Sequence, residues 1–196
     1  MILTGRAGDV SETQRRMLEE AEKACGRVTA LVAEMSDLAN LEAGTATPNR
    51  SSLDLRALLA DAIAALPPLP DGEVDVTLTT GDGPARIQGD SARLTTALTS
   101  ILKALRRELV ASPTLFVRES QRKHEGRHVS WIAVGDGEHI DSLAAATAAS
   151  LTTFDEWRGG SGLALAIARR IIAAHGGAVW SPGDGARAGA VILLPH

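Results

Sequence analysis

Aromatic residues and cysteine are scarce in this sequence of 196 residues, and each scarcity excludes a class of protein. Aromatic residues make up 3% of the chain and tyrosine is absent, so the stacking platforms that bind single-stranded nucleic acid are not expected. The single cysteine, Cys25, cannot form an internal disulfide. This usage fits a reducing compartment, and we therefore expect a cytoplasmic location.

Strong charge of one sign and long apolar runs are also absent. The net charge is -4 and the basic residues are dispersed, which predicts no DNA or RNA partner. No apolar run is long enough to span a bilayer, and the first ten residues lack a signal pattern, so no membrane association is expected. Hydrophobic residues make up 44% of the chain, enough for one ordinary domain with an added helical element.

A long amphipathic helix is predicted from about Glu12 to Ala43. Ser11 and Gln14 have the spacing of a capping box at its start, and Gly44 followed by Pro48 ends it. Apolar residues recur at steps of three and four and form one stripe: Met17, Ala21, Ala24, Val28, Leu31, Met35 and Leu38. Such a stripe needs a partner, most simply a second copy, so we expect a homodimer through residues 12–43 in a helical bundle.

The rest of the chain alternates between helix and strand patterns. Helices are predicted at residues 55–66, 91–110 and 163–174, and strands at 74–78, 115–118, 129–134, 178–180 and 190–194. The polar segment 121–126 is expected to separate the two middle strands as a loop, and the alanine-rich segment 142–151 fits either state. This order predicts an α+β sandwich, with a mixed sheet covered by helices on one face.

One glycine-rich segment carries a specific resemblance. Gly159-Gly160-Ser161-Gly162-Leu163-Ala164-Leu165-Ala166-Ile167, with His175-Gly176-Gly177 after the helix, resembles the second glycine box of histidine-kinase ATPase domains. In such a box, glycines let the backbone approach phosphates, and the following helix N-terminus favours an anion. Two interpretations stay open, a phosphate cradle and a structural relic that only lets a helix start close to the sheet; the departures described below favour the relic.

The resemblance extends over most of the chain. The matching segments are Leu38–Gly44 (end of the second helix of the kinase dimerisation hairpin), Asp54–Leu59 (entry to the ATPase domain), Gly89-Asp90 with Arg93-Leu94, and Leu194-Pro195. It implies the Bergerat, or GHKL, α/β sandwich. It also implies two parts, a dimerisation helix at 1–46 and a histidine-kinase-like ATPase domain at 51–196.

Several family residues are missing. The two asparagine positions of the family's metal-binding helix hold Ser100 and Ala104, and alanine has no oxygen ligand for magnesium. In the first glycine box, Gly135 stands where the family has its adenine-binding aspartate. A shift of one residue places Asp136 in that role. The resemblance therefore implies at most a relic or weak nucleotide site, with no metal site, at Asp136, Gly137, Gly160, Gly162 and Leu163.

The phosphorylated histidine of the family is not recognisable either. None of the five histidines lies in the family's His-Glu/Asp-Leu-Arg context, and Met1–Gly5 resembles the last turn of the first dimerisation helix. We therefore expect that this first helix is truncated or lies upstream. Phe154 and Trp157 stand where the family has its mobile nucleotide lid, and we expect them to pack the empty site shut.

The preferred hypothesis is a non-catalytic, histidine-kinase-like signalling protein, a pseudokinase of two-component systems. It has no catalytic residue and no cofactor, and it binds a response regulator receiver domain or a histidine kinase. The alternative is a divergent histidine kinase that binds ATP with magnesium and phosphorylates a histidine in trans, or a phosphotransfer fragment whose acceptor histidine lies upstream.

Overall fold

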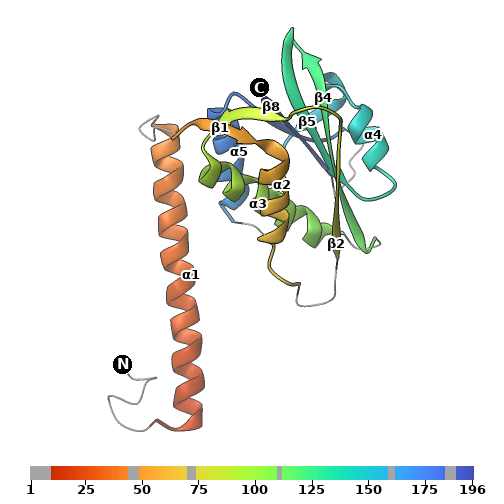
Figure 1. The fold of residues 1–196 in the computed structure, drawn as a ribbon. Coiled ribbons are helices and arrows are strands. Elements are labelled where there is room, and N and C mark those ends of the chain that lie inside the picture. Colours follow the sequence, from red (N-terminus) through yellow and green to blue (C-terminus); the bar gives the residue numbers. More distant parts are fainter. Residues whose placement is uncertain (1–9, 44–48, 70–73, 110–111, 159–161, 184–188) are drawn as a thin grey trace.

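A long helix projects from an α/β sandwich in the computed structural model, which describes residues 10–43, 49–69, 74–109, 112–158, 162–183 and 189–196 (Figure 1). The helix α1 spans Glu12–Glu42, as predicted. Its capping box is formed, because the Ser11 N–H donates to Gln14 Oε1 at 2.8 Å and the Gln14 N–H donates to Ser11 Oγ at 3.3 Å. Met1–Gly5, compared above with the end of a first helix, lies outside the described residues.

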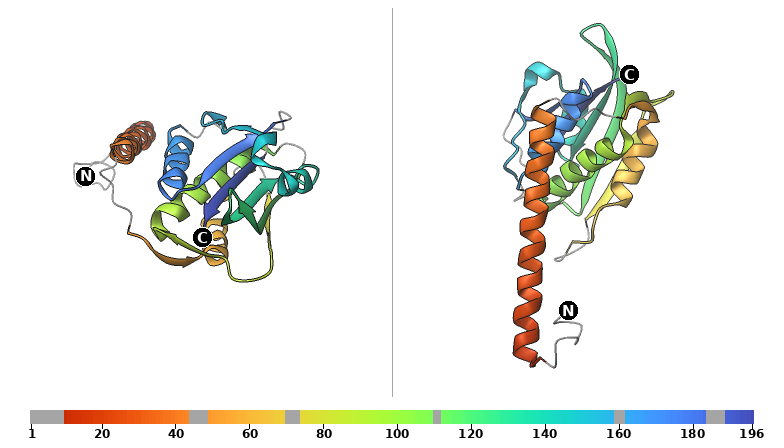
Figure 2. Two further views of the ribbon diagram at one scale, coloured as in Figure 1. Left: turned by 90° about the horizontal axis from the view of Figure 1, so that it is seen from above. Right: turned by 90° about the vertical axis from the view of Figure 1, so that its left-hand side faces the viewer.

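Among the described side chains of α1, several large apolar ones are exposed in the single chain. Its C-terminal part lies beside α5 (Ala164–Ala174), while the rest of the helix extends away from the sandwich (Figures 1 and 2). The large apolar side chains that are at least 60% exposed on this helix are Met17, Val28, Val32 and Met35. Leu31 and Leu38, which also belong to the predicted stripe, have side chains outside the described part of the structure.

A six-stranded mixed sheet forms the centre of the sandwich. The strand order is β2-β4-β5-β8-β7-β6, with β2 parallel to β4 and the other neighbouring strands antiparallel. The strands are β2 (Asp75–Thr80), β4 (Thr114–His124), β5 (Arg127–Gly135), β8 (Ala190–Pro195), β7 (Ala178–Pro182) and β6 (Leu151–Thr153). Two further short strands, β1 (Ser51–Asp54) and β3 (Arg86–Gly89), pair antiparallel with each other.

The main core lies between this sheet and three helices. These helices are α2 (Leu55–Ala64), α3 (Ser91–Glu108) and α5, and their apolar faces share one buried cluster with Ile132 and Val134 of β5. Because side chains alternate along a strand, the intervening Trp131 and Ala133 face the opposite side, where they join a second cluster with α4 (Ile140–Ala145). The predicted sandwich is confirmed, with the addition that α4 covers part of the second face (Figure 2).

The middle hairpin differs from the prediction. The polar segment 121–126 is not a loop, because β4 continues to His124 and β5 begins at Arg127. The turn is confined to Glu125 and Gly126, both with positive φ (49° and 79°), which matches the right-handed twist of the strands. The alanine-rich segment 142–151 comprises the end of α4, a 3-10 turn at Ala148–Ser150 and the start of β6.

Candidate functional site

The start of α3 is fixed by Asp90. Its carboxylate caps the helix by accepting from the Arg93 N–H at 3.1 Å, and it also accepts from the Asn49 N–H at 3.0 Å. The hydrogen bond from Arg93 lowers the pKa of the Asp90 carboxyl, partial burial opposes that change, and the bond from Asn49 supports it. One side chain therefore ties the residues just before β1 to the helix that carries the family's metal-binding position.

The His175-Gly176-Gly177 motif has a structural role at the end of α5. The buried His175 ring accepts from the Asp90 N–H at Nε2 (3.0 Å), so its Nδ1 carries the proton that it donates to the Ile171 carbonyl (2.7 Å). Gly176 has φ +75°, the left-handed conformation that ends many helices. A Cβ on Gly177 would lie 2.3 Å from the Leu193 carbonyl oxygen, so only glycine lets the chain pass β8 at this distance.

The second glycine box is described only in part. Gly160 lies outside the described residues, as do its two neighbours. Gly162 is exposed with φ +59°, and Leu163 directly after it packs partly against the main core as α5 begins. The glycine thus supplies the backbone turn that the relic interpretation requires, and the same turn is compatible with a phosphate cradle.

Asp136 uses its carboxylate within its own turn. Its Oδ1 accepts from the Glu138 N–H at 3.1 Å and the His139 N–H at 2.9 Å, and lies 2.7 Å from His139 Nδ1. Burial alone would raise the pKa of Asp136, but the contacts with His139 and Glu138 outweigh it and lower the pKa. Gly137 lies beside the Phe116 ring, which a Cβ there would approach to 3.5 Å. A role of either residue in nucleotide binding stays a prediction.

Ala104 is part of the apolar core. The side chain is 1% exposed and belongs to the same buried cluster as Leu165 and Ala168 of α5, the helix against which α3 packs. Ser100, the other family asparagine position, lies one turn earlier and is half-buried. The helix face that would have to hold a metal ion therefore presents a methyl group to a packed interior.

An ion pair joins Arg158, which precedes the glycine box in the sequence, to Glu108 at the end of α3. The Arg158 guanidinium donates to Glu108 Oε2 from Nη2 (2.6 Å) and from Nε (3.0 Å). Its Nη1 donates to the Gly189 carbonyl at 2.9 Å and lies 3.5 Å from Ser181 Oγ. The Arg158 and Glu108 side chains are only 7% and 17% exposed. Glu108 stands one turn after Ala104, so the ion pair joins this face of α3 to β7 and to the residue before β8.

The two aromatic residues that we expected to pack the empty site shut lie in different environments. Phe154 is buried in the main core, 5.8 Å below the Arg158 guanidinium. Trp157 is 76% exposed and does not close the site. Arg158, directly after Trp157, is buried, and its charge is matched by Glu108.

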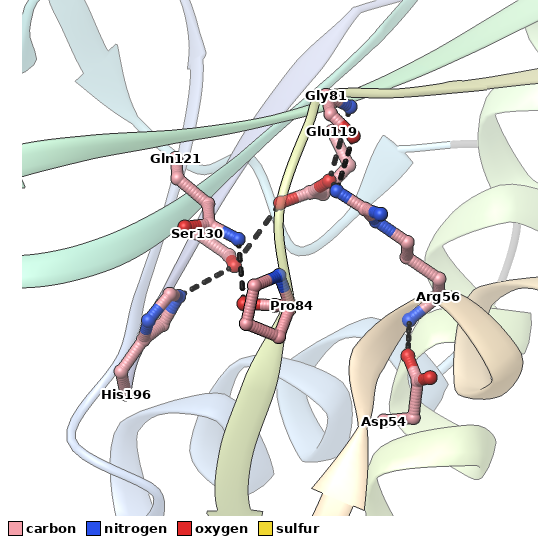
Figure 3. Close-up of polar contacts among 8 residues, drawn as sticks. All are labelled: Asp54, Arg56, Gly81, Pro84, Glu119, Gln121, Ser130 and His196. Carbon is pink, nitrogen blue, oxygen red and sulfur yellow. Dashed lines mark hydrogen bonds and ion pairs between the residues drawn. The ribbon is translucent and has the colours of Figure 1, made fainter.

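A second polar network, shown in Figure 3, lies near the opposite end of β5 from Gly135. The buried Glu119 carboxylate contacts Arg56 Nε at 3.3 Å and accepts from the Ser130 hydroxyl at 3.3 Å. It also lies 3.4 Å from the Gly81 N–H, and Ser130 Oγ lies 3.0 Å from His196 Nε2. Ser130 stands between the acid and the histidine, so these groups fasten α2 to the sheet and do not form the order of a hydrolytic triad.

Two of the described positions offer little to a magnesium-bound nucleotide held in the manner of the family. Within the described ranges, no three His, Cys, Asp or Glu side chains converge as metal ligands. Ala104 offers no oxygen, and the Asp136 carboxylate is engaged by its own turn. None of the described helices is long and apolar enough to cross a membrane.

No family model matches the sequence. It is 29% identical over 194 residues to the sensor-like histidine kinase SenX3 of Mycobacterium tuberculosis, an alignment that covers 91% of this chain and 45% of that protein. The sensor protein GacS of Pseudomonas syringae pv. syringae is 25% identical over 199 residues, covering 95% of this chain and 22% of GacS. The chain thus spans less than half the length of these relatives.

Two solved structures have the same fold. The Acinetobacter baumannii histidine kinase AdeS superposes with a TM-score of 0.66 at 16% identity, over 99% of this chain and 93% of that one. Full-length ShkA, solved in complex with AMPPNP, superposes with a TM-score of 0.68 at 19% identity, over 98% of this chain and 40% of that one.

The sheet and the three helices on its main face, with α5 following the glycine box, define a GHKL-type α/β sandwich. In sequence, the similarity to the sensor-like histidine kinase SenX3 supports a relationship to the sensor histidine kinases.

Proposed function

We propose that this protein is a non-catalytic member of the family, a pseudokinase that acts by binding other two-component proteins. One observation carries the proposal, namely that the family's metal-ligand position is the buried Ala104. One turn later on α3, Glu108 forms an ion pair with Arg158. A nucleotide triphosphate needs a cation to offset its charge, and an apolar α3 face cannot hold one. In the same proposal residues 1–46 are a dimerisation element and 51–196 a degenerate ATPase-like domain, in the cytoplasm.

The proposal includes a homodimer through residues 12–43. The exposed Met17, Val28, Val32 and Met35 support it, because soluble monomers rarely leave a contiguous apolar band in water. Replacing Val28 and Met35 by Asp is expected to convert the dimer to a monomer by light scattering. Both side chains are exposed in the single chain, so the variant keeps its fold and the change in mass reports on association alone.

Nucleotide binding tests the central claim. Isothermal titration with ATP and magnesium is expected to give no saturable heat at low micromolar concentration. An Ala104→Asn variant is expected to remain without full binding, since one restored metal ligand does not restore the adenine contact. Trp157, exposed and two residues before the glycine box, provides a second readout through its fluorescence. Saturable binding at low micromolar ATP would exclude the pseudokinase interpretation.

Phosphate transfer and partner capture test the signalling role. The partner is proposed to be a response regulator receiver domain or a histidine kinase, in line with the relatives' membership of two-component systems. Incubation with radiolabelled ATP is expected to leave this chain unlabelled, and capture from its own cells is expected to enrich two-component proteins. Label on any of its five histidines would refute the non-catalytic claim.

A divergent ATP-dependent histidine kinase is the second candidate. The left-handed Gly162 before α5 favours it, because this backbone turn is compatible with a phosphate cradle. It predicts that ATP binding depends on Asp136 and Gly137, and that an acceptor histidine upstream of this sequence or on another chain takes the phosphate. Loss of measured ATP binding in an Asp136→Ala variant would favour this candidate over the first.

A further inference from the structure

Among the described residues, no strand pairs with the outer side of β2, which is an edge of the main sheet. It is the terminal strand in the order β2-β4-β5-β8-β7-β6, and it pairs with β4 and contacts α2 (Figure 1). The opposite edge is the three-residue β6, too short to pair extensively with another chain. The six residues of β2, by contrast, can align a full added strand.

The hydrogen bonds to β4 identify which backbone groups of β2 face outward. The Asp75 N–H donates to the Pro113 carbonyl and the Gly81 N–H donates to the Glu119 carbonyl, both at 2.9 Å. In a parallel pair alternate residues face the neighbouring strand, so the odd-numbered residues of β2 point to β4. The N–H and C=O groups of Val76, Leu78 and Thr80 therefore point away from the sheet.

The usual protections of an edge strand are missing from β2. Proteins guard such edges with lysine, proline, bulges or inward charges, but residues 76–80 are uncharged and contain no proline. Val76 and Leu78 are half-buried against the main core, and Thr77 and Thr79 are exposed on the other face. An added strand that fits this edge has apolar side chains at alternate positions, hydroxyls between them and no central charge.

The sequence of β2 itself meets that description, and we propose that β2 pairs antiparallel with β2 of a second copy of this chain. Antiparallel pairing about a two-fold axis at Leu78 places each Val76 opposite the other copy's Thr80. In this pairing the backbone groups of Val76, Leu78 and Thr80 form hydrogen bonds with the same residues of the second copy. The apolar faces of the two sheets then lie on the same side of the joined sheet. The seam joins two six-stranded sheets into one continuous sheet.

Charge placement supports the same register. Asp75, the charged residue of β2, lies opposite Gly81 of the second copy and not opposite the other Asp75. At about 3.4 Å per residue, the two Asp75 side chains are about 20 Å apart, beyond a Debye length at physiological salt. On the exposed face, Thr77 stands opposite the second copy's Thr79 as a close, non-hydrogen-bonded pair.

Cysteine cross-linking tests the register. In full-length chains carrying Cys25→Ser, one preparation has Thr77→Cys and the other Thr79→Cys. Both positions are exposed, so each variant folds. Residues in a non-hydrogen-bonded antiparallel pair have Cα atoms about 4.5 Å apart, within disulfide range. Mild oxidation of the mixture is expected to give at least fivefold more cross-linked dimer than oxidation of either variant alone.

A matched pair at Thr80 tests the hydrogen bonds. Thr80→Pro removes an outward N–H that β4 does not use, whereas Thr80→Val keeps it. The proline change, made in both cysteine chains, is expected to lower the mixed cross-link at least fivefold, and the valine change is expected to preserve it. Equal cross-linking in mixed and unmixed samples would overturn the proposal, as would equal cross-linking in the proline and valine variants. A dimer that forms through α1 alone predicts equal cross-linking in both comparisons. The experiment therefore distinguishes the α1 interface from the β2 interface.

Discussion

The Arg158–Glu108 ion pair leads to a prediction about stability. Replacing either residue by Ala is expected to destabilise the fold, because each change leaves the other charge buried without its main partner. Breaking a fully buried pair from one side costs about 3 to 5 kcal/mol. Since the side chains are 7% and 17% exposed, water compensates part of that cost, and we expect about 2 to 4 kcal/mol for each single variant.

The double variant separates the pair from its surroundings. Arg158 also donates to the Gly189 carbonyl, so Arg158→Ala removes more than the ion pair. Removing Glu108 as well is expected to cost less than the sum of the two single changes, with a coupling of about 1 to 3 kcal/mol. Arg158→Lys retains the charge but not the planar fork, and is expected to lie between the parent and Arg158→Ala.

Urea unfolding measures these differences in the free energy of unfolding. The protein concentration is kept fixed because dimerisation shifts the apparent stability. For a chain of this length, 1 kcal/mol corresponds to about 2 to 4 °C in the thermal midpoint, so a loss of about 10 °C is expected for each single variant. Additive effects, with a coupling under about 0.5 kcal/mol, would show that the contact does not hold α3 to β7 and β8.

Three other changes test the fold around the site. Gly177→Ala is expected to destabilise the fold by at least about 2 kcal/mol in urea unfolding, because its Cβ would lie 2.3 Å from a β8 carbonyl oxygen. Gly26→Ala in α1 is the control, and because the space around Gly26 is open it is expected to be neutral or stabilising by up to about 1 kcal/mol. Equal effects of the two changes would contradict the steric argument. The pKa of Asp90 is lowered on folding, so its contribution to stability is present above about pH 4 and is lost as the pH falls through the lower folded value. When stability is measured against pH, Asp90→Asn is expected to reduce the loss of stability in acid. An unchanged pH profile would count against this assignment. Glu119→Ala is expected to cost about 2 to 4 kcal/mol in the same unfolding assay, because it removes the carboxylate that pairs with Arg56 and accepts from Ser130. A loss under about 1 kcal/mol would mean that the network of Figure 3 contributes little.

Most of the fold follows from periodicity in the sequence. The helices α1, α3 and α5 have long apolar stripes, and their predicted ranges agree with the structure to within two residues at each end. The strands β1 and β3 were not predicted because each has four residues and an apolar pattern too short to recognise. The hairpin turn was placed too broadly because the polar residues of β4 extend beyond its neighbour β2 and read as a loop.

The polar contacts were less predictable. Glu119 has the same parity as Leu115 and Val117 in β4, so the alternation already placed its carboxylate on the buried face, where a partner is required. The pairing of Arg158 with Glu108, 50 residues away, has no local signal in the sequence, because it depends on how α3 and the sheet pack. The exposure of Trp157 likewise has no local signal in the sequence, because it depends on the packing of the neighbouring Arg158.

The projection of α1 has a mechanical consequence. With 31 residues at about 1.5 Å each, the helix is a lever about 46 Å long, of which only the C-terminal part rests on α5. Just beyond it along the chain, the Asn49 N–H is held by Asp90 and the Arg50 side chain donates to the Ala174 carbonyl at the end of α5. A tilt of about 10° at this pivot displaces the far end of the helix by about 8 Å. Small movements where α3 and α5 meet the chain are therefore converted into large displacements at the other end of the molecule.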